Sequence, residues 1–424
     1  DFDFVRQLIT EDLIPENVWI QVLVQCRPEL IARTYEALQG APRAIVHFYN
    51  STNPLQREVV FNLDKGGIKQ VAIDGATMCK QHEADLFGTE IRYEYSPESF
   101  TLTEPDYAVE VCEAVMEVWE PTEKNPIILN LPATVELFTP NVHADQIEWF
   151  CRNMQERNKA VISLHTHNDR GTGVAASELG LMAGAERIEG TLFGNGERTG
   201  NCDVITMAMN LFSQGVDPGL YLKDMPKIVE VSEACTKIPI HVRQPYAGDL
   251  VFTAFSGSHQ DAIRKGMAYV ESGSDGAWEV PYLPIDPADV GGSYRETVRV
   301  NSQSGKGGVA FVLENYFGVH LPRELLLELS PIIQQVSEAD GGELTADVIW
   351  STFVSELVEV EGPYQLLSYD VKSSSAEKET CQAVIKIAES EISIAGEGSG
   401  PIDAFVSALS QSINEPLNVV DYQE

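Results

Sequence analysis

Short apolar runs alternate with longer amphipathic segments over the first 245 residues of the chain. The apolar runs predict buried strands of a parallel sheet, and the amphipathic segments predict helices that pack on it. Strands are expected at Val18–Val24, Ala44–Phe48, Glu90–Tyr95, Ile127–Leu131, from Ala160 onward, at Arg187–Phe193 and at Ile238–Ile240. Helices are expected at Asp1–Thr10, Pro28–Leu38, Pro54–Asn62, Gly67–Gln81, Pro105–Trp119, His143–Arg157, from Gly173, from Asp203 and at Met225–Thr236.

This alternation places the segment in the α/β class and predicts a (β/α)8 TIM barrel. A closed barrel of this type has eight strands, whereas the pattern gives seven. Either the count is wrong or the first strand lies before Asp1. An open, doubly wound sheet is the alternative that the pattern leaves.

The pattern changes to period two near the end of the chain. Tyr364–Lys372, Cys381–Ala388 and Glu391–Ala395 read as antiparallel strands. The glycine-rich stretch from Gly396 opens a helix, and Leu417–Asp421 is expected to begin another strand. This part of the chain therefore predicts a small α+β unit.

Polar clusters follow two neighbouring strands of the predicted barrel. His165 and His167 stand at the end of the strand that begins at Ala160, and side chains at i and i+2 share one face of a strand. The two imidazoles should therefore converge, which makes them candidate metal ligands, although many paired histidines are only hydrogen-bonded in place. The loop from Gly194 to Asn201 follows the next strand, at the edge where barrels of this type carry their active sites.

Composition narrows the functional classes. The formal charge of −35, from 64 acidic and 29 basic residues, disfavours nucleic acid and anionic membranes as partners. Seven scattered cysteines without a CxxC pair suit a reducing compartment. We find neither an apolar run long enough to cross a bilayer nor a signal peptide, so a cytoplasmic protein is expected.

Five motifs together resemble the 2-isopropylmalate synthase family, over nearly the whole chain and most closely in its long, actinobacterial-type form. They are Tyr95-Ser-Pro-Glu-Ser99, Asn130-Leu-Pro-Ala-Thr-Val-Glu136, His165-Thr-His-Asn-Asp-Arg-Gly171, Gly194-Asn-Gly-Glu-Arg-Thr-Gly-Asn201 and Phe255-Ser-Gly-Ser-His-Gln-Asp261. The resemblance implies an acyltransferase that condenses acetyl-CoA with 3-methyl-2-oxobutanoate in leucine biosynthesis. It also implies a divalent metal ion (Mg²⁺, Mn²⁺ or Zn²⁺), a homodimer and leucine as a feedback inhibitor.

The same resemblance implies a division of the chain into domains and implies that the family's sequences continue beyond both of its ends. It implies a barrel domain over 1–245, helical linker subdomains over 246–300 and 301–362, and part of a leucine-binding regulatory domain over 363–424. The family's aspartate metal ligand, beside an arginine at the end of the first strand, falls before Asp1. The chain is therefore expected to be a truncated form, with an incomplete set of metal ligands and an incomplete regulatory domain.

Individual roles follow from the resemblance position by position. His165, His167 and Asn201 correspond to the metal site, Thr134 to a contact of the oxo-acid carboxylate, and Glu98 to a residue near the acetyl group that can share the work of a base. His259, with Tyr282 as its companion, resembles the histidine that reaches a neighbouring subunit's site and helps to remove the acetyl methyl proton. Without the resemblance, Thr134 and Asn201 suit a turn or cap, and His259 suits the start of a surface helix.

Three other functions stay open at this point. A homocitrate or citramalate synthase would differ in the oxo acid that it accepts. A non-catalytic binding subunit would explain the missing Arg-Asp motif. A metal-dependent lyase of the aldol type could use the same barrel, although the regulatory-like tail argues against it.

Overall fold

The computed structural model describes residues 1–254, 256–273, 278–292, 306–340, 344–360, 362–375 and 378–419. The chain forms two compact units. The first comprises 1–221 and 226–248, and the second comprises 222–225 and 249–424. None of the described helices is both long enough and apolar enough to cross a bilayer.

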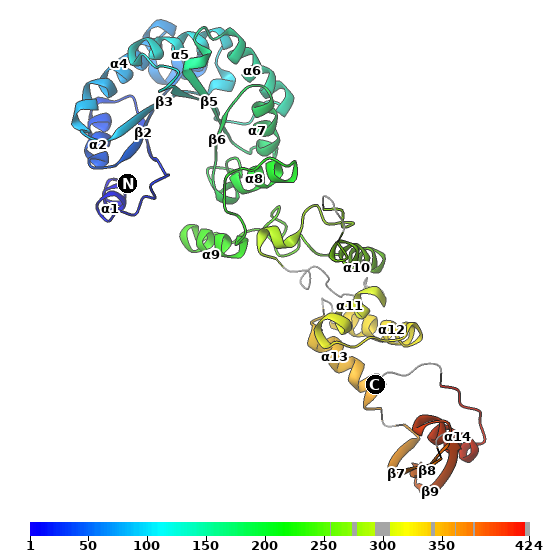
Figure 1. Cartoon of the computed structure of the whole chain (residues 1–424). Helices are drawn as coiled ribbons and strands as arrows, with labels where there is room; N and C mark the ends of the chain where they lie inside the picture. The colour runs from blue at the N-terminus through cyan, green and yellow to red at the C-terminus, as the bar shows by residue number, and fades with distance from the viewer. Residues whose placement is uncertain are drawn as a thin grey trace. The chain divides into compact units, whose positions relative to one another are not determined.

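The first unit is built on six parallel strands that pair in chain order. They are β1 (Ile20–Gln25), β2 (Arg43–Ser51), β3 (Glu90–Glu98), β4 (Ile127–Ala133), β5 (Ala160–Thr166) and β6 (Arg187–Glu189). Figure 1 shows them on the inner side of an arc, with helices on the outer side. The predicted α/β barrel-type fold is confirmed, because consecutive parallel strands joined by outer helices are its defining feature.

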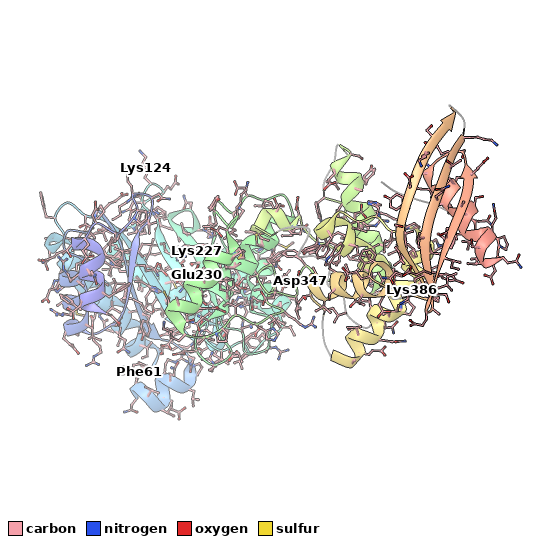
Figure 2. The ribbon with its side chains drawn as sticks, turned by 90° about the horizontal axis from the view of Figure 1, so that it is seen from below. Phe61, Lys124, Lys227, Glu230, Asp347 and Lys386 are labelled. Atoms are coloured by element: carbon pink, nitrogen blue, oxygen red, sulfur yellow. The ribbon has the colours of Figure 1, made fainter. Side chains whose placement is uncertain are left out.

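The helices of this unit lie where the amphipathic segments predict them, with small shifts at the ends. They are α1 (Phe2–Thr10), α2 (Pro28–Leu38), α3 (Pro54–Gln56) with a π-helix at Arg57–Phe61, α4 (Lys65–His82), α5 (Pro105–Trp119), α6 (Pro140–Asn153), α7 (Gly173–Met182), α8 (Val204–Ser213) and α9 (Met225–Thr236). The helix predicted at Pro54–Asn62 thus becomes two short pieces that end at Asn62, which is left-handed. These pieces expose Leu55, Val59 and Val60, and Figure 2 shows Phe61 on this segment, at the edge of the unit.

The strand predicted at Ile238–Ile240 is wrong, since these residues follow α9 without joining a sheet. Their backbone groups bond locally instead: the Ile238 N–H donates to Thr236 Oγ1 at 3.2 Å and the Ile240 N–H to Glu233 Oε1 at 2.7 Å. A segment whose backbone N–H groups already bond to side chains of the preceding helix gains little from pairing with a neighbouring strand. The strand predicted at Arg187–Phe193 is also shorter, ending at Glu189.

The core lies between the sheet and the outer helices. Trp119 of α5 stacks on Tyr93 with ring centroids 4.3 Å apart, meets Phe48 edge-on, and donates its indole N–H to the Ala76 carbonyl of α4 at 2.9 Å. A Cβ on Gly180 of α7 would lie 2.3 Å from Leu164 Cδ1, so this glycine permits the close packing that the small residues of the helix predict.

One buried histidine of α6 makes the first unit sensitive to acid. His143 is buried, and neither ring nitrogen has a hydrogen-bond partner among the described residues. Burial lowers the pKa of His143 to about 4, whereas an unfolded histidine titrates near 6.5. The unfolded chain therefore takes up the proton first, and stability is lost as the pH falls from about 6.5 towards about 4.

We expect His143→Phe to raise the free energy of unfolding by about 1 kcal/mol at pH 7, because two unsatisfied polar atoms leave the core. The advantage should widen between pH 6.5 and 4, by at most about 3 kcal/mol. Urea denaturation at pH 7, 5.5 and 4.5 measures both effects, with His143→Leu as a second, smaller replacement. An unchanged pH dependence in both variants would contradict this assignment.

The second unit combines helices with a three-stranded antiparallel sheet. Its helices are α10 (Gly257–Glu271), α11 (Lys306–Phe317), α12 (Arg323–Asp340), α13 (Ala346–Phe353) with a π-helix at Val354–Val358, and α14 (Pro401–Ile413). Its strands are β7 (Tyr364–Ser375), β8 (Lys378–Ile387) and β9 (Ser390–Gly398), paired in the order β7-β8-β9. The antiparallel strands predicted from the period-two pattern are confirmed, and α14 packs its Ala404 and Ala408 into the core beside Ile385 and Ile394.

The last predicted strand is not formed where the structure describes it. Residues 417–419 are irregular, and the other two residues of Leu417–Asp421 lie outside the described residues. The Leu417 N–H donates to Ser410 Oγ of α14 at 3.0 Å, which ties this segment back to the helix.

Candidate active site

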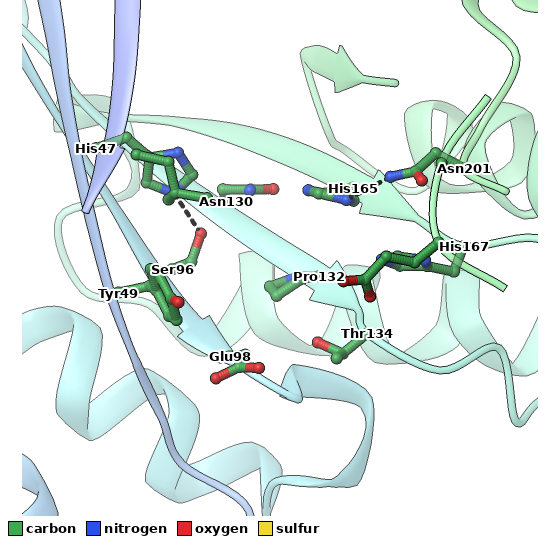
Figure 3. A pocket seen from close by; sticks show the side chains of 13 residues that line it. His47, Tyr49, Ser96, Glu98, Asn130, Pro132, Thr134, His165, His167 and Asn201 are labelled. Atoms are coloured by element: carbon green, nitrogen blue, oxygen red, sulfur yellow. Dashed lines mark hydrogen bonds between the residues drawn. The ribbon is translucent and has the colours of Figure 1, made fainter. Parts of the chain in front are cut away.

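A cavity of about 360 Å³ opens at the carboxyl end of the parallel sheet, within the first unit. Figure 3 shows its wall, which carries Leu23, His47, Tyr49, Ser96, Glu98, Asn130, Pro132, Thr134, His165, His167, Gly196, Glu197 and Asn201. β1 to β5 and the loops that follow β4, β5 and β6 each supply part of this wall. The cavity therefore lies at the edge of the sheet where the sequence predicts the active site.

The two histidines at the end of β5, His165 in the strand and His167 directly after it, converge as the strand pattern predicts. The rings of His165 and His167 lie nearly parallel, with centroids 5.2 Å apart and an angle of 15° between their planes. His165 Nε2 lies 2.8 Å from Asn201 Nδ2, and His167 Nδ1 is buried without a hydrogen-bond partner among the described residues. Burial lowers the pKa of both imidazoles, which favours the neutral form that binds a metal ion.

The loop after β6 holds Asn201 beside His165 through its glycines. A Cβ on Gly196 would lie 1.8 Å from Asn201 Oδ1, and a Cβ on Gly200 would lie 2.0 Å from the Gly194 carbonyl oxygen. Gly200 also has φ +100°, a conformation that other residues rarely adopt. The glycines therefore let the backbone fold closely enough to bring the Asn201 amide to the histidines.

Thr134 and Glu98 face the same cavity from the ends of β4 and β3 (Figure 3). The Ser99 N–H donates to Thr134 Oγ1 at 2.9 Å, so the threonine hydroxyl keeps its own proton for another acceptor. Glu98 accepts a short hydrogen bond from the Ser51 hydroxyl. The structure thus gathers five of the predicted site residues, Glu98, Thr134, His165, His167 and Asn201, around one cavity. The Thr134 hydroxyl among them can donate to an anion.

Several residues of the wall were not predicted from the sequence, notably His47, Tyr49, Ser96, Asn130 and Pro132. The signal was available, because within each strand they stand two positions from another residue of the wall, as His165 does from His167. Residues two positions apart share one face of a strand, which is how the histidines at the end of β5 were identified. The same rule applied to β2, β3 and β4 would have identified these residues of the wall.

The floor of the cavity is a buried polar network. His47 Nε2 lies 2.7 Å from Ser96 Oγ, and its Nδ1 lies 3.0 Å from Gln21 Nε2 and 3.2 Å from Glu94 Oε1. Burial lowers the pKa of His47 to about 4, so this imidazole is neutral at pH 7. The floor therefore presents a neutral ring rather than a charge to whatever fills the cavity.

Arg187 of β6 connects this floor to two carboxyl groups. Its Nη1 lies 2.5 Å from Glu189 Oε1 and 3.3 Å from Glu94 Oε2, and its Nη2 donates to Gln21 Oε1 at 2.8 Å. Burial, followed by the nearby Glu189, raises the pKa of Glu94. Burial opposes ionisation of Glu189 as well, but Glu94 and Arg187 together lower the pKa of Glu189 to about 2.

His47, Glu94 and Glu189 also form a group whose ligand atoms lie within 4.8 Å of one another. Such a donor set could hold a cation, but the Arg187 guanidinium already places a positive charge against both carboxyl groups. The donors of His165, His167 and Asn201, with an unsatisfied His167 nitrogen, fit a metal ion better.

His259 and Tyr282 belong to the second unit. Their rings stack with centroids 4.0 Å apart and an interplanar angle of 22°. Tyr282 is exposed and has φ +65°, an uncommon conformation for a bulky residue. The structure thus brings the two predicted companions together, while their catalytic role stays a prediction.

Comparison with protein families divides the chain into three matched segments. The HMGL-like family matches residues 1–232, the alpha-isopropylmalate synthase post-catalytic domain-like family matches 249–314, and the LeuA allosteric (dimerisation) domain matches 343–424. The first of these alone covers more than half of the chain.

Curated proteins similar to this chain agree with the family matches. The 2-isopropylmalate synthase of Rhodospirillum rubrum is 54% identical over 427 residues, covering 100% of this chain and 76% of that protein. The 2-isopropylmalate synthase of a Parafrankia species is also 54% identical, over 429 residues, with the same coverage. Among solved structures, the HMG-CoA lyase from Brucella melitensis is 16% identical with a TM-score of 0.41, covering 52% of this chain and 75% of that one.

Proposed function

Because the chain belongs to the 2-isopropylmalate synthase family, we propose that it condenses acetyl-CoA with 3-methyl-2-oxobutanoate to give 2-isopropylmalate and CoA, a step of leucine biosynthesis. The observation that carries this proposal is one cavity whose wall holds His165, His167, Asn201, Thr134 and Glu98 together. This set combines nitrogen donors, a hydroxyl donor and a carboxylate base, as a condensation of this kind requires.

A divalent ion, Mg²⁺, Mn²⁺ or Zn²⁺, completes the proposal. His165, His167 and Asn201 would hold it, and when bound it supplies the positive charge that polarises the ketone of the oxo acid. The buried, unpartnered Nδ1 of His167 and the contact between His165 and Asn201 support this choice of ligands.

Side chains of the protein bind the oxo acid and accept the proton that leaves the acetyl methyl group. The Thr134 hydroxyl, already fixed by the Ser99 N–H, is placed to donate to the carboxylate of the oxo acid. Glu98 would take the proton from the acetyl methyl group, with His259 and Tyr282 contributed by a neighbouring subunit, and the resulting carbanion attacks the ketone carbon to form the new carbon–carbon bond. Water then cleaves the thioester and releases CoA.

The cavity wall also favours an oxo acid with a branched, uncharged side chain. Among the residues that line it, all of them in the described part of the chain, none is a lysine or arginine, whereas Glu98 and Glu197 are acidic. The second carboxylate of 2-oxoglutarate would lie unpaired beside them, and pyruvate would leave the space beside Leu23, Tyr49 and Pro132 unfilled. These residues therefore argue against the homocitrate and citramalate alternatives.

We expect kcat/KM for 3-methyl-2-oxobutanoate to exceed that for pyruvate by about 10- to 200-fold, the range for lost apolar contacts in a pocket. The preference over 2-oxoglutarate should be at least as large. Release of free thiol from acetyl-CoA, measured with each oxo acid and each of the three metal ions, tests this order. Faster turnover of another oxo acid would reassign the substrate. Ion binding without any thiol release would instead indicate a binding subunit.

A homodimer and leucine feedback are the remaining parts of the proposal. The match of residues 343–424 to the LeuA allosteric (dimerisation) domain supports both.

A further inference from the structure

The loops that follow β4, β5 and β6 meet at one guanidinium. Arg198 donates from Nε to Asp169 Oδ1 at 2.7 Å and from Nη2 to Asp169 Oδ2 at 3.1 Å, which is a bidentate ion pair. The same Nη2 donates to the Thr134 carbonyl oxygen at 2.7 Å. A single side chain therefore joins the ends of two strands to the loop that carries Asn201.

This connection continues on the far side of Asp169. Asp169 Oδ2 also accepts the Glu136 N–H at 2.9 Å, and Glu136 in turn accepts the Arg170 N–H at 2.5 Å and a short hydrogen bond from the Thr172 hydroxyl. Thr134 and Glu136 on one loop, and the residues just after His167 on the next, are thus fixed to each other at two successive points.

The backbone of Arg198 supports a functional reason for this contact. Arg198 has φ +54°, a left-handed conformation that costs about 1–2 kcal/mol for a residue with a side chain. Gly200, two residues further on, also has a positive φ, but as a glycine it does not carry this cost. Strain of this kind persists where the surrounding contacts require one geometry, which is common at binding sites.

We propose that Arg198 is a positioning residue for the oxo acid. Its guanidinium fixes the backbone of Thr134 relative to His167, and so fixes the distance between the hydroxyl that receives the carboxylate and the imidazoles that face the ketone. The inference rests on the proposed function of the cavity and adds to it a residue that touches neither substrate. Lysine keeps the charge at this position but cannot form the two-pronged contact.

The test compares Arg198→Lys with Arg152→Lys, a matched change at an exposed arginine of α6 that pairs only with Glu148 among the described contacts. In Arg198→Lys, KM for 3-methyl-2-oxobutanoate should rise about tenfold, while KM for acetyl-CoA changes less than twofold. Arg152→Lys should leave both constants within twofold. An oxo-acid KM within twofold of wild type, or an equal rise in both constants, would overturn the proposal.

A double variant shows whether the two partners act as one unit. Asp169→Asn alone should also raise the oxo-acid KM about tenfold, and Arg198→Lys/Asp169→Asn should give about the same tenfold rise rather than about a hundredfold. Additive effects would mean that the two residues act separately, against the proposal.

Amide exchange separates this inference from the proposed function. The Glu136 N–H, bonded to Asp169, should exchange about tenfold faster in Arg198→Lys than in wild type. If the wild type releases no thiol with any oxo acid, the proposed function fails. The exchange rate of the Glu136 N–H still shows whether Arg198 fixes the loop that carries Thr134. An unchanged Glu136 rate would overturn the positioning role.

Discussion

Replacing His167 with alanine is expected to lower kcat for thiol release about a thousandfold and to weaken binding of the divalent ion at the cavity. The change removes one of two imidazoles whose rings lie 5.2 Å apart. Loss of a group that merely supports a metal ligand costs 10- to 100-fold, so loss of a ligand should cost more. Isothermal titration with the metal ion alone and the thiol assay measure the two effects independently.

The control for His167→Ala is His82→Ala, which removes a half-exposed imidazole of α4 that pairs with Asp85. This variant should keep both the ion affinity and kcat. Unimpaired ion binding in His167→Ala would place the ion elsewhere, with the group of His47, Glu94 and Glu189 as the first alternative.

Replacing Arg187 with methionine is expected to lower the free energy of unfolding by about 3 kcal/mol at pH 7, the lower end of the cost of breaking a buried ion pair, because the Arg187 side chain is 28% exposed. The guanidinium lies against Glu94, which is fully buried, and Glu189, whereas the nearby His47 is neutral at pH 7 and supplies no positive charge. Methionine fills much of the space but leaves the carboxyl groups without their positive partner.

The loss should shrink as the pH falls. Without Arg187 the pKa of Glu189 would rise from its present value of about 2, because one of the groups that lower it is gone while burial remains. Protonation then removes the unpaired charge at mildly acidic pH. Urea denaturation at pH 7 and pH 5 measures this trend, and Arg187→Met/Glu189→Gln should recover a large part of the loss at pH 7.

Arg33→Met provides the matched control for Arg187→Met, since Arg33 is exposed and pairs with Glu36 one turn along α2. It should change stability by less than about 0.5 kcal/mol. An equally small effect of Arg187→Met would contradict this prediction. It would mean that Glu94 and Glu189 do not need the positive charge of Arg187 in the folded protein.

The sequence predicted most of the barrel because the signals are local. Apolar runs and 3.6-residue periodicity mark β1 to β6 and their helices within a few residues. The failure at Ile238–Ile240 is also physical, because an apolar tripeptide becomes a strand only if a neighbouring strand is free to pair with it, and side chains of α9 satisfy its backbone first.

The same distinction between local and long-range relations holds for the site residues. His165 and His167 could be predicted because they stand two positions apart at the end of β5. The network beneath the cavity was not, because Arg187 meets Glu94 across 93 residues and Gln21 across 166. The sequence Arg-Ile-Glu of β6 alone does not indicate that Arg187 and Glu189 face the interior of the unit.

The placement of the cavity has a consequence for how such enzymes diversify. All 13 residues around it come from positions 23 to 201, in the first compact unit, whereas His259 and Tyr282 belong to the second. If the cavity selects the oxo acid as proposed, residues 23–201 make that choice without the second unit. A duplicated copy could then acquire a new substrate through changes at a few alternate strand positions, while the second unit stays unaltered.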